Sequence, residues 1–192
     1  MYLPRLNFIF ILLLLVTYTC FSQDKKKDSI TVPKRFYTTN PIESLTPPVI
    51  DGILTDESWN VVEWATDYIQ REPEENVSPT EQTKFKIIYD KKNLYVAFRC
   101  YDKEPDKIVK RMSRRDGFEG DWVEINFDSY HDLRSGFSFT VSASGVKGDE
   151  AISLNGNNWD GSWDPIWYVK TNIDEEGWTA EMRIPLSQLR FG

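Results

Sequence analysis

Apolar and polar side chains alternate along much of the chain from residue 84 onward. Phe85, Ile87 and Tyr89 alternate with more polar neighbours, and a second alternating run covers residues 94–101. A period of two residues is that of a β-strand with one buried face. The turn-forming residues 90–93 lie between the two runs, so this part of the sequence predicts a β-hairpin.

The same pattern predicts further short strands, separated by turn-rich stretches. Their ranges are 122–128, 137–142, 150–154, 166–171 and 178–184. A single short helix is expected near Asp56 to Trp64, with Thr55 or Asp56 as its N-cap. Many short strands with one small helix predict an all-β protein, an antiparallel β-sandwich of the immunoglobulin-like or jelly-roll-like kind. The side chains expected to face its core are Leu94, Val96, Phe98, Val123, Ile125, Phe127, Trp178 and Ile184.

The first 22 residues have the pattern of a signal peptide. Arg5 is followed by an apolar run at residues 8–16, which is too short to span a bilayer. Small residues at Cys20 and Ser22 favour cleavage before Gln23. Lipid attachment at Cys20 and a retained membrane anchor are the alternatives. Export predicts the periplasm, the cell surface or the outer membrane as the location.

Residues 23–46 mix charges, prolines and single apolar residues without a sustained period. We interpret them as a linker or leading strand, with residues 30–32 and 35–37 as candidate edge strands. Ordered structure is expected from Pro47, where a pre-proline segment runs into the Asp51–Gly52 turn. The domain is therefore assigned to residues 47–192.

Composition excludes several functions. Removal of the signal peptide also removes Arg5 and leaves 22 basic against 30 acidic residues, a charge of −8 that argues against nucleic-acid binding. His131 is the only histidine, which argues against a histidine-rich zinc site and a Ser-His-Asp hydrolase. If Cys20 is removed, Cys100 has no partner for an internal disulfide. The 170 remaining residues suffice for one domain with its own core.

The strand at residues 122–128 also predicts a binding surface. If Val123 and Ile125 enter the core, Trp122, Glu124 and Asn126 share the outer face. An aromatic ring, a carboxylate and an amide suit a sugar, which offers an apolar face and hydroxyl groups. An ordinary hydrated sheet face is the alternative interpretation.

Four segments, in this order, resemble the family 9 carbohydrate-binding modules: 49–59 (VIDGILTDESW), 89–98 (YDKKNLYVAF), 121–128 (DWVEINFD) and 177–185 (GWTAEMRIP). The match spans roughly residues 47–192. A closer resemblance is to the amino-terminal domain of exported bacterial proteins of unknown function whose carboxy-terminal region is predicted to form a β-barrel. Segments 71–73, 102–106, 114–116, 129–132 and 163–167 are similar to that group.

The resemblance implies a sugar clamped between two aromatic rings, helped by a carboxylate, an arginine and amides. The carboxylate falls on Glu124, whereas Thr140 lies where the arginine is expected. The family places its second ring in strands after the GWTAEMRIP segment, so the resemblance predicts a domain that is incomplete at its carboxy-terminal end. The candidate ligand-binding residues are Phe118 or Trp122 as first ring, Glu124 and Asn126 as polar groups, and the loop residues Trp159 and Trp163 as substitutes for the second ring.

The leading functional hypothesis is a non-catalytic module that binds a poly- or oligosaccharide, linked to carbohydrate breakdown in its parent protein. The alternative is a structural or interaction domain that precedes an outer-membrane β-barrel and binds no sugar. No catalytic residues are assigned to this domain, although the full-length parent could be a glycoside hydrolase. No cofactor is expected. The resemblance allows calcium at acid-rich turns such as Asp51, Asp56 and 128–132, with solvated turns as the other reading.

Cleavage before Gln23 can be measured directly. We expect mass spectrometry of the protein from an exporting host to give a mature chain that begins at Gln23, because the apolar run is short and Cys20 and Ser22 are small. A lipid-modified amino terminus at Cys20, or an intact Met1 in the membrane fraction, would contradict this prediction.

Overall fold

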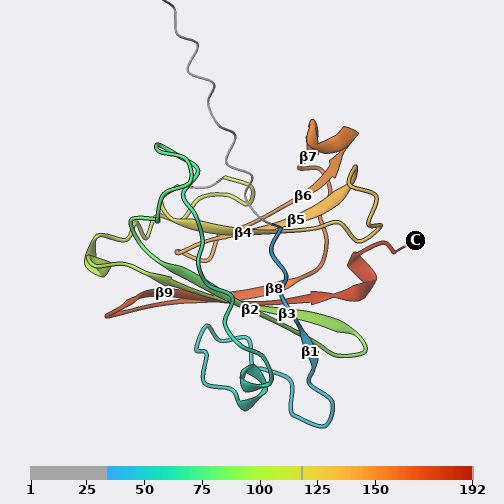
Figure 1. The fold of residues 1–192 in the computed structure, drawn as a ribbon, viewed down its shortest axis with the longest axis horizontal. Coiled ribbons are helices and arrows are strands. Elements are labelled where there is room, and N and C mark those ends of the chain that lie inside the picture. Colours follow the sequence, from blue (N-terminus) through green and yellow to red (C-terminus); the bar gives the residue numbers. More distant parts are fainter. Residues whose placement is uncertain (1–33, 118, 192) are drawn as a thin grey trace, which may run out of the picture. The chain divides into compact units, whose positions relative to one another are not determined.

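The computed structural model describes residues 34–117 and 119–191 (Figure 1). The chain divides into two units, 1–36 and 37–192, and every strand named below belongs to the second. The signal peptide, the cleavage position before Gln23 and the candidate ring of Phe118 lie outside the described residues. In the part of the chain that is described, no helix is long and apolar enough to cross a membrane.

Two β-sheets pack face to face, which confirms the predicted β-sandwich (Figure 1). The strand orders are β1-β2-β3-β9-β8 in the five-stranded sheet and β4-β5-β6-β7 in the four-stranded sheet. Neighbouring strands are antiparallel, except that the two-residue β1 runs parallel to β2. The bounds are β1 Asn40–Pro41, β2 Thr83–Tyr89, β3 Asn93–Tyr101, β4 Trp122–Phe127, β5 Gly136–Ser142, β6 Lys147–Ser153, β7 Asn158–Asp160, β8 Tyr168–Asp174 and β9 Gly177–Pro185.

The main core lies between the two sheets. Phe139 and Val141 of β5 and Ala180 and Met182 of β9 are fully buried at its centre. Alternation places every second side chain of a strand on this side. The predicted inward-facing residues all lie in this core or pack against it: Val96, Phe98, Val123, Trp178 and Ile184 are buried, and Leu94, Ile125 and Phe127 are partly buried.

The short helix expected near Asp56 to Trp64 is present but shorter than predicted. A 3-10 helix, η1, covers only Glu57–Val61, and Val62 is already extended. The Asp56 side chain does not cap it and instead accepts a hydrogen bond from the Val49 N–H at 3.3 Å. Trp59 within this helix and Val62 directly after it are both buried. Three more 3-10 helices follow: η2 Pro105–Lys107, η3 Leu154–Gly156 and η4 Leu186–Gln188.

A second core covers the outer face of the five-stranded sheet. Ile42, Trp59 and Val62 are buried there against Ile88 and Tyr95 of the sheet. The segment 23–46 therefore contributes, in its described part, both β1 and a core residue. Residues 35–37 form no strand.

The carboxylate of Glu181 joins this covering segment to the sheet. Glu181 lies in the middle of β9 and is fully buried. One carboxylate oxygen accepts the Trp59 indole N–H at 2.9 Å, and the other accepts the backbone N–H groups of Gly52 at 2.9 Å and Asp51 at 3.1 Å. Burial nevertheless raises the pKa of Glu181 to about 7. Two segments 120 or more residues apart are thus held by one side chain.

Glycine is required at position 52 for two reasons. Its φ of +89° lies in the left-handed region that disfavours other residues. A Cβ there would also lie 2.8 Å from the Thr171 carbonyl carbon of β8. The Gly52 carbonyl in turn accepts the Thr179 hydroxyl at 2.5 Å, so the Asp-Gly turn lies directly against β8 and β9.

Replacing Glu181 by Gln should weaken the fold. The amide keeps the shape but turns an NH₂ group toward N–H donors, so we expect a loss of about 1–3 kcal/mol in the free energy of unfolding. The folded protein holds the Glu181 proton more tightly than the unfolded chain does, because the pKa rises from 4.5 to about 7. This contribution to wild-type stability is complete below about pH 4.5 and is lost as the pH rises through about 7.

Urea unfolding of both proteins at pH 5 and pH 8 is the measurement. We expect a larger difference between wild type and Glu181→Gln at pH 5 than at pH 8. An equal difference at both pH values, or a larger one at pH 8, would contradict the role given to this carboxyl group.

Candidate functional site

The outer face of the four-stranded sheet carries the row of side chains that the alternation predicts. Trp122 is 50% exposed, Glu124 is partly buried and Asn126 is exposed, while Val123 and Ile125 between them contact the core. The Asn126 amide donates a hydrogen bond to Glu124 Oε1 at 2.6 Å. The exposed ring of Trp122 therefore lies beside an oriented carboxylate on one face.

The next strand, β5, supplies hydroxyl groups to the same face. Thr140 pairs with Glu124 and donates to its Oε2 at 3.5 Å, a long hydrogen bond. Ser138 pairs with Asn126, and its hydroxyl is buried without a hydrogen-bond partner among the described residues. This face is thus polar across β4 and β5, and it includes the unpaired Ser138 hydroxyl.

The strands β6 and β7 extend the face. Glu150 lies opposite Ser138, and Trp159 of β7 lies opposite Ile152 of β6. Trp159 is 43% exposed, and its indole N–H donates to the Gly156 carbonyl at 2.9 Å. Glu150 was not among the predicted site residues, because its place depends on the strand register and not on any local motif.

Trp122 and Trp159 are too far apart to clamp one sugar. They lie at opposite edges of the sheet, three strand spacings or roughly 14 Å apart, and are also offset by about 20 Å along the strands. Two rings that sandwich one pyranose must lie on the order of 7–8 Å apart. Trp159 therefore does not replace the second ring of a clamp built on Trp122.

Trp163 is not part of this face, contrary to the prediction from its polar loop. Its ring packs in the main core, 4.7 Å from the Phe137 ring and 5.5 Å from that of Phe139. Both phenylalanines point inward from β5, so Trp163 is on the other side of the sheet. The loop that carries Trp163 thus places this ring in the core, which its polar composition does not predict.

Carboxylates give this face an acidic character. Burial raises the pKa of Glu150, and the negative charges of Glu124, Asp116 and Asp149 raise it further. The charge of Glu124 thus acts on Glu150 across β5. Carboxylates accept hydrogen bonds from hydroxyl groups, so the face suits a ligand rich in hydroxyl donors.

The acid-rich turns use their carboxylates to hold backbone N–H groups. Asp128 accepts from the N–H groups of Asp132 and Leu133, at 3.1 and 2.8 Å. Asp132 accepts from those of Arg134 and Ser135, and Asp51 from that of Ile53. Within the described residues, no group of three or more His, Cys, Asp or Glu side chains is placed to hold a metal ion.

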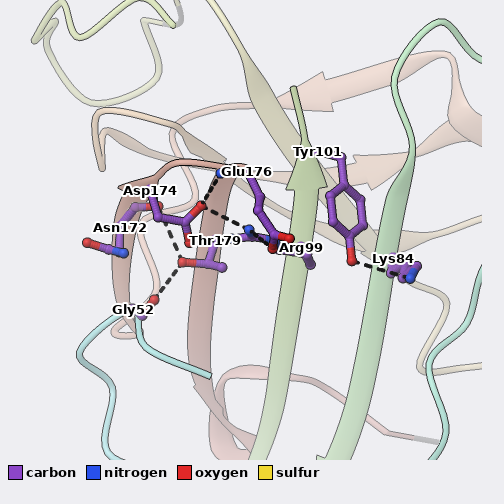
Figure 2. Close-up of polar contacts among 8 residues, drawn as sticks. All are labelled: Gly52, Lys84, Arg99, Tyr101, Asn172, Asp174, Glu176 and Thr179. Carbon is purple, nitrogen blue, oxygen red and sulfur yellow. Dashed lines mark hydrogen bonds and ion pairs between the residues drawn. The ribbon is translucent and has the colours of Figure 1, made fainter. Parts of the chain in front are cut away.

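A second polar cluster lies on the outer face of the five-stranded sheet (Figure 2). The Arg99 guanidinium, whose side chain is 10% exposed, donates to both oxygens of Asp174 at 2.6 and 2.9 Å and to Glu176 at 2.8 Å. The Tyr101 ring lies beside it, and the Tyr101 hydroxyl accepts a hydrogen bond from Lys84. The Arg99 charge is paired with Asp174 and Glu176, so this part of the cluster stabilises the sheet.

A family model described as "carbohydrate family 9 binding domain-like" matches residues 50–191, so the chain belongs to that family. No curated protein matches the sequence.

Solved structures show the same fold. A family 9 carbohydrate-binding module from Caldicellulosiruptor kristjanssonii in complex with glucose is 26% identical (TM-score 0.55) and aligns over 78% of this chain and 70% of its own. A structure from the same organism in complex with cellotriose is also 26% identical (TM-score 0.56), with 80% and 68% covered. A protein from Bacteroides uniformis at 14% identity shares the fold (TM-score 0.52), with 67% and 62% covered.

Replacing Arg99 by Lys should test the structural role of the second cluster. Lysine keeps the charge but cannot form the bidentate hydrogen bond with Asp174. We therefore expect the free energy of unfolding at pH 7 to fall by about 1–2 kcal/mol. Hydrogen bonds from Arg99 hold the pKa of Asp174 below its usual value of 3.8. This stabilisation is present above that value and is lost as the pH falls through the folded pKa.

The difference between the two proteins should therefore shrink between pH 7 and pH 2 in denaturant titrations. A variant as stable as wild type at pH 7, or a difference that grows on acidification, would contradict this assignment.

Proposed function

We propose that the chain is a non-catalytic carbohydrate-binding module that holds a glucose-based oligosaccharide on the outer face of its four-stranded sheet. The observation that carries the proposal is the half-exposed ring of Trp122 beside Glu124, whose carboxylate is oriented by Asn126 and Thr140. Membership of the family and the glucose and cellotriose complexes of the 26% identical Caldicellulosiruptor modules support it.

Recognition follows from the chemistry of these three groups. The apolar face of a pyranose stacks on the Trp122 ring and buries apolar area. Hydroxyl groups of the sugar donate to Glu124, and the Asn126 amide can donate to a sugar oxygen. Each such contact contributes only about 1 kcal/mol after exchange with water, so the expected affinity is modest.

The arrangement of carboxylates favours binding over hydrolysis. A glycosidase places two carboxyl groups on either side of the bond that it cleaves. Glu124 and Glu150 instead project from the same side of one sheet, on β4 and β6. We therefore assign neither a catalytic role.

Phe118 stays a candidate ring. It follows Gly117, which lies in the segment leading into β4, and the family resemblance places the first ring of the clamp near it. Export, a parent protein of carbohydrate breakdown and a carboxy-terminal β-barrel in the same parent are further parts of the proposal. They are supported by the sequence features described above.

Calorimetric titration with cellotriose tests the proposal. We expect Trp122→Ala and Glu124→Gln each to weaken binding by roughly tenfold, equivalent to about 1.4 kcal/mol. Tyr130→Ala is the matched control, because Tyr130 is exposed but lies in the connection between β4 and β5 and not in a strand of the face. This variant should leave the affinity unchanged. Equal thermal stability of all variants shows that the fold is intact.

A structural domain without sugar binding would give a different result. Wild-type protein that releases no heat with cellotriose or with a panel of other neutral oligosaccharides would favour that alternative. Binding that survives both substitutions would move the site away from this face.

A further inference from the structure

A second surface, which shares no residue with the Trp122 face, forms a pocket. Its volume is about 620 Å³, within the range of small-ligand sites. The extended segment 47–50 forms one wall, and Tyr168 and Lys170 of β8 with Arg183 of β9 form another. Lys147 reaches it from the other sheet. Nothing in the proposed sugar-binding face contributes to this lining.

The pocket is basic, whereas the chain as a whole is acidic. Three cationic side chains, Lys147, Lys170 and Arg183, line it, and no Asp or Glu does. The whole chain carries a net charge of −7. A basic pocket in an acidic protein attracts an anion locally while the rest of the surface repels it.

The Arg183 side chain contacts an aromatic ring. Among residues 34–117 and 119–191 it forms no ion pair with a carboxylate. Its guanidinium stacks on the Tyr168 ring, 4.2 Å from the centroid, and the two residues are paired in the sheet. Stacking occupies the flat side of a guanidinium and leaves the N–H groups in its plane free to donate. Arg99 differs, because Asp174 and Glu176 use its donors (Figure 2).

Lys147 is held in position by Trp167 and, among the described residues, forms no direct ion pair with a carboxylate. Its ammonium group donates to the Trp167 carbonyl at 2.9 Å and lies over the Trp167 ring, 4.9 Å from the centroid. Burial lowers the pKa of Lys147, and the neighbouring charge of Arg115 lowers it further. The nearest carboxylates, Asp149 and Asp164, are both paired with Arg115.

The segment 47–50 adds an apolar lining to the pocket. Val49 is largely exposed there, and Ile50 lies next to it in the same extended segment. A ligand that fits must carry a negative charge on one side and an apolar face on the other. A uronic acid residue has both, because its ring carbon–hydrogen face is apolar and its carboxylate can form two parallel hydrogen bonds with an arginine.

We infer that this pocket binds the uronic acid residue of an acidic saccharide, with its carboxylate on Arg183, supported by Lys170 and Lys147, and its ring against Val49 and Ile50. The saccharide nature of the ligand rests on the proposed function, whereas its negative charge rests on the pocket alone. The pocket is thus a second, charge-selective site beside the neutral-sugar face.

Titration with sodium glucuronate, followed by nuclear magnetic resonance, tests the inference. We expect Arg183→Gln to weaken glucuronate binding at least roughly tenfold, as for the loss of one charge-assisted contact. Lys170→Gln should weaken it by a smaller factor. Lys91→Gln removes the same charge from an exposed hairpin and should have no effect. Arg183→Lys keeps the charge but cannot form two parallel hydrogen bonds with a carboxylate. Its affinity for glucuronate should lie between those of wild type and Arg183→Gln.

Two further ligands and one variant separate this site from the proposed function. Glucose should not perturb the pocket resonances, and acetate should bind at least tenfold more weakly than glucuronate, because it lacks the ring. Trp122→Ala should leave glucuronate binding intact. If cellotriose fails to bind but glucuronate binds through Arg183, the proposed function fails and the anion site stands.

Three results would overturn the inference. The first is no glucuronate binding by the wild-type protein. The second is equal affinity of Arg183→Gln and Lys91→Gln, both with wild-type melting temperatures. The third is acetate binding as tightly as glucuronate, which would refute the saccharide ligand.

Discussion

The buried carboxylate of Glu181 is the interaction on which the arrangement of this domain depends. Three N–H groups from the segment 51–59 converge on it, and in return the segment lies over the outer face of the five-stranded sheet. A buried carboxylate is tolerated only when it is hydrogen-bonded, so the segment and the sheet require each other. The first and last motifs of the family resemblance are therefore two halves of one contact.

This contact makes the two outer faces of the sandwich unequal. The five-stranded sheet is covered at one end by the second core, and its Arg99 cluster is paired internally. The four-stranded sheet keeps Trp122, Glu124 and Asn126 on an outer face with no such covering core among the described residues. The segment 47–50, drawn onto β8 by the same tie, forms the wall of the basic pocket. Both proposed sites thus follow from where one segment is anchored.

Local periodicity was enough to predict the longer strands and the outward row of β4, but not the two short strands β1 and β7. Val123 and Glu124 face opposite sides because a strand cannot place neighbours on one side, whatever its partners. Long-range packing decided the rest. Trp163 lies in a polar loop yet fills the core beside Phe137, and Arg183 finds its aromatic partner only through the pairing of β8 with β9.

If sugar binds beside Trp122, it should leave the buried tryptophans undisturbed. Titration of ¹⁵N-labelled protein with cellotriose, following the indole N–H resonances, tests it most directly. Trp59 and Trp167 serve as internal controls, because their indoles are buried and bonded to Glu181 and Asp149. We expect a saturable shift of the Trp122 indole resonance, with the Trp59 and Trp167 indole resonances unchanged. A Trp122 resonance that stays fixed at saturating cellotriose would contradict it.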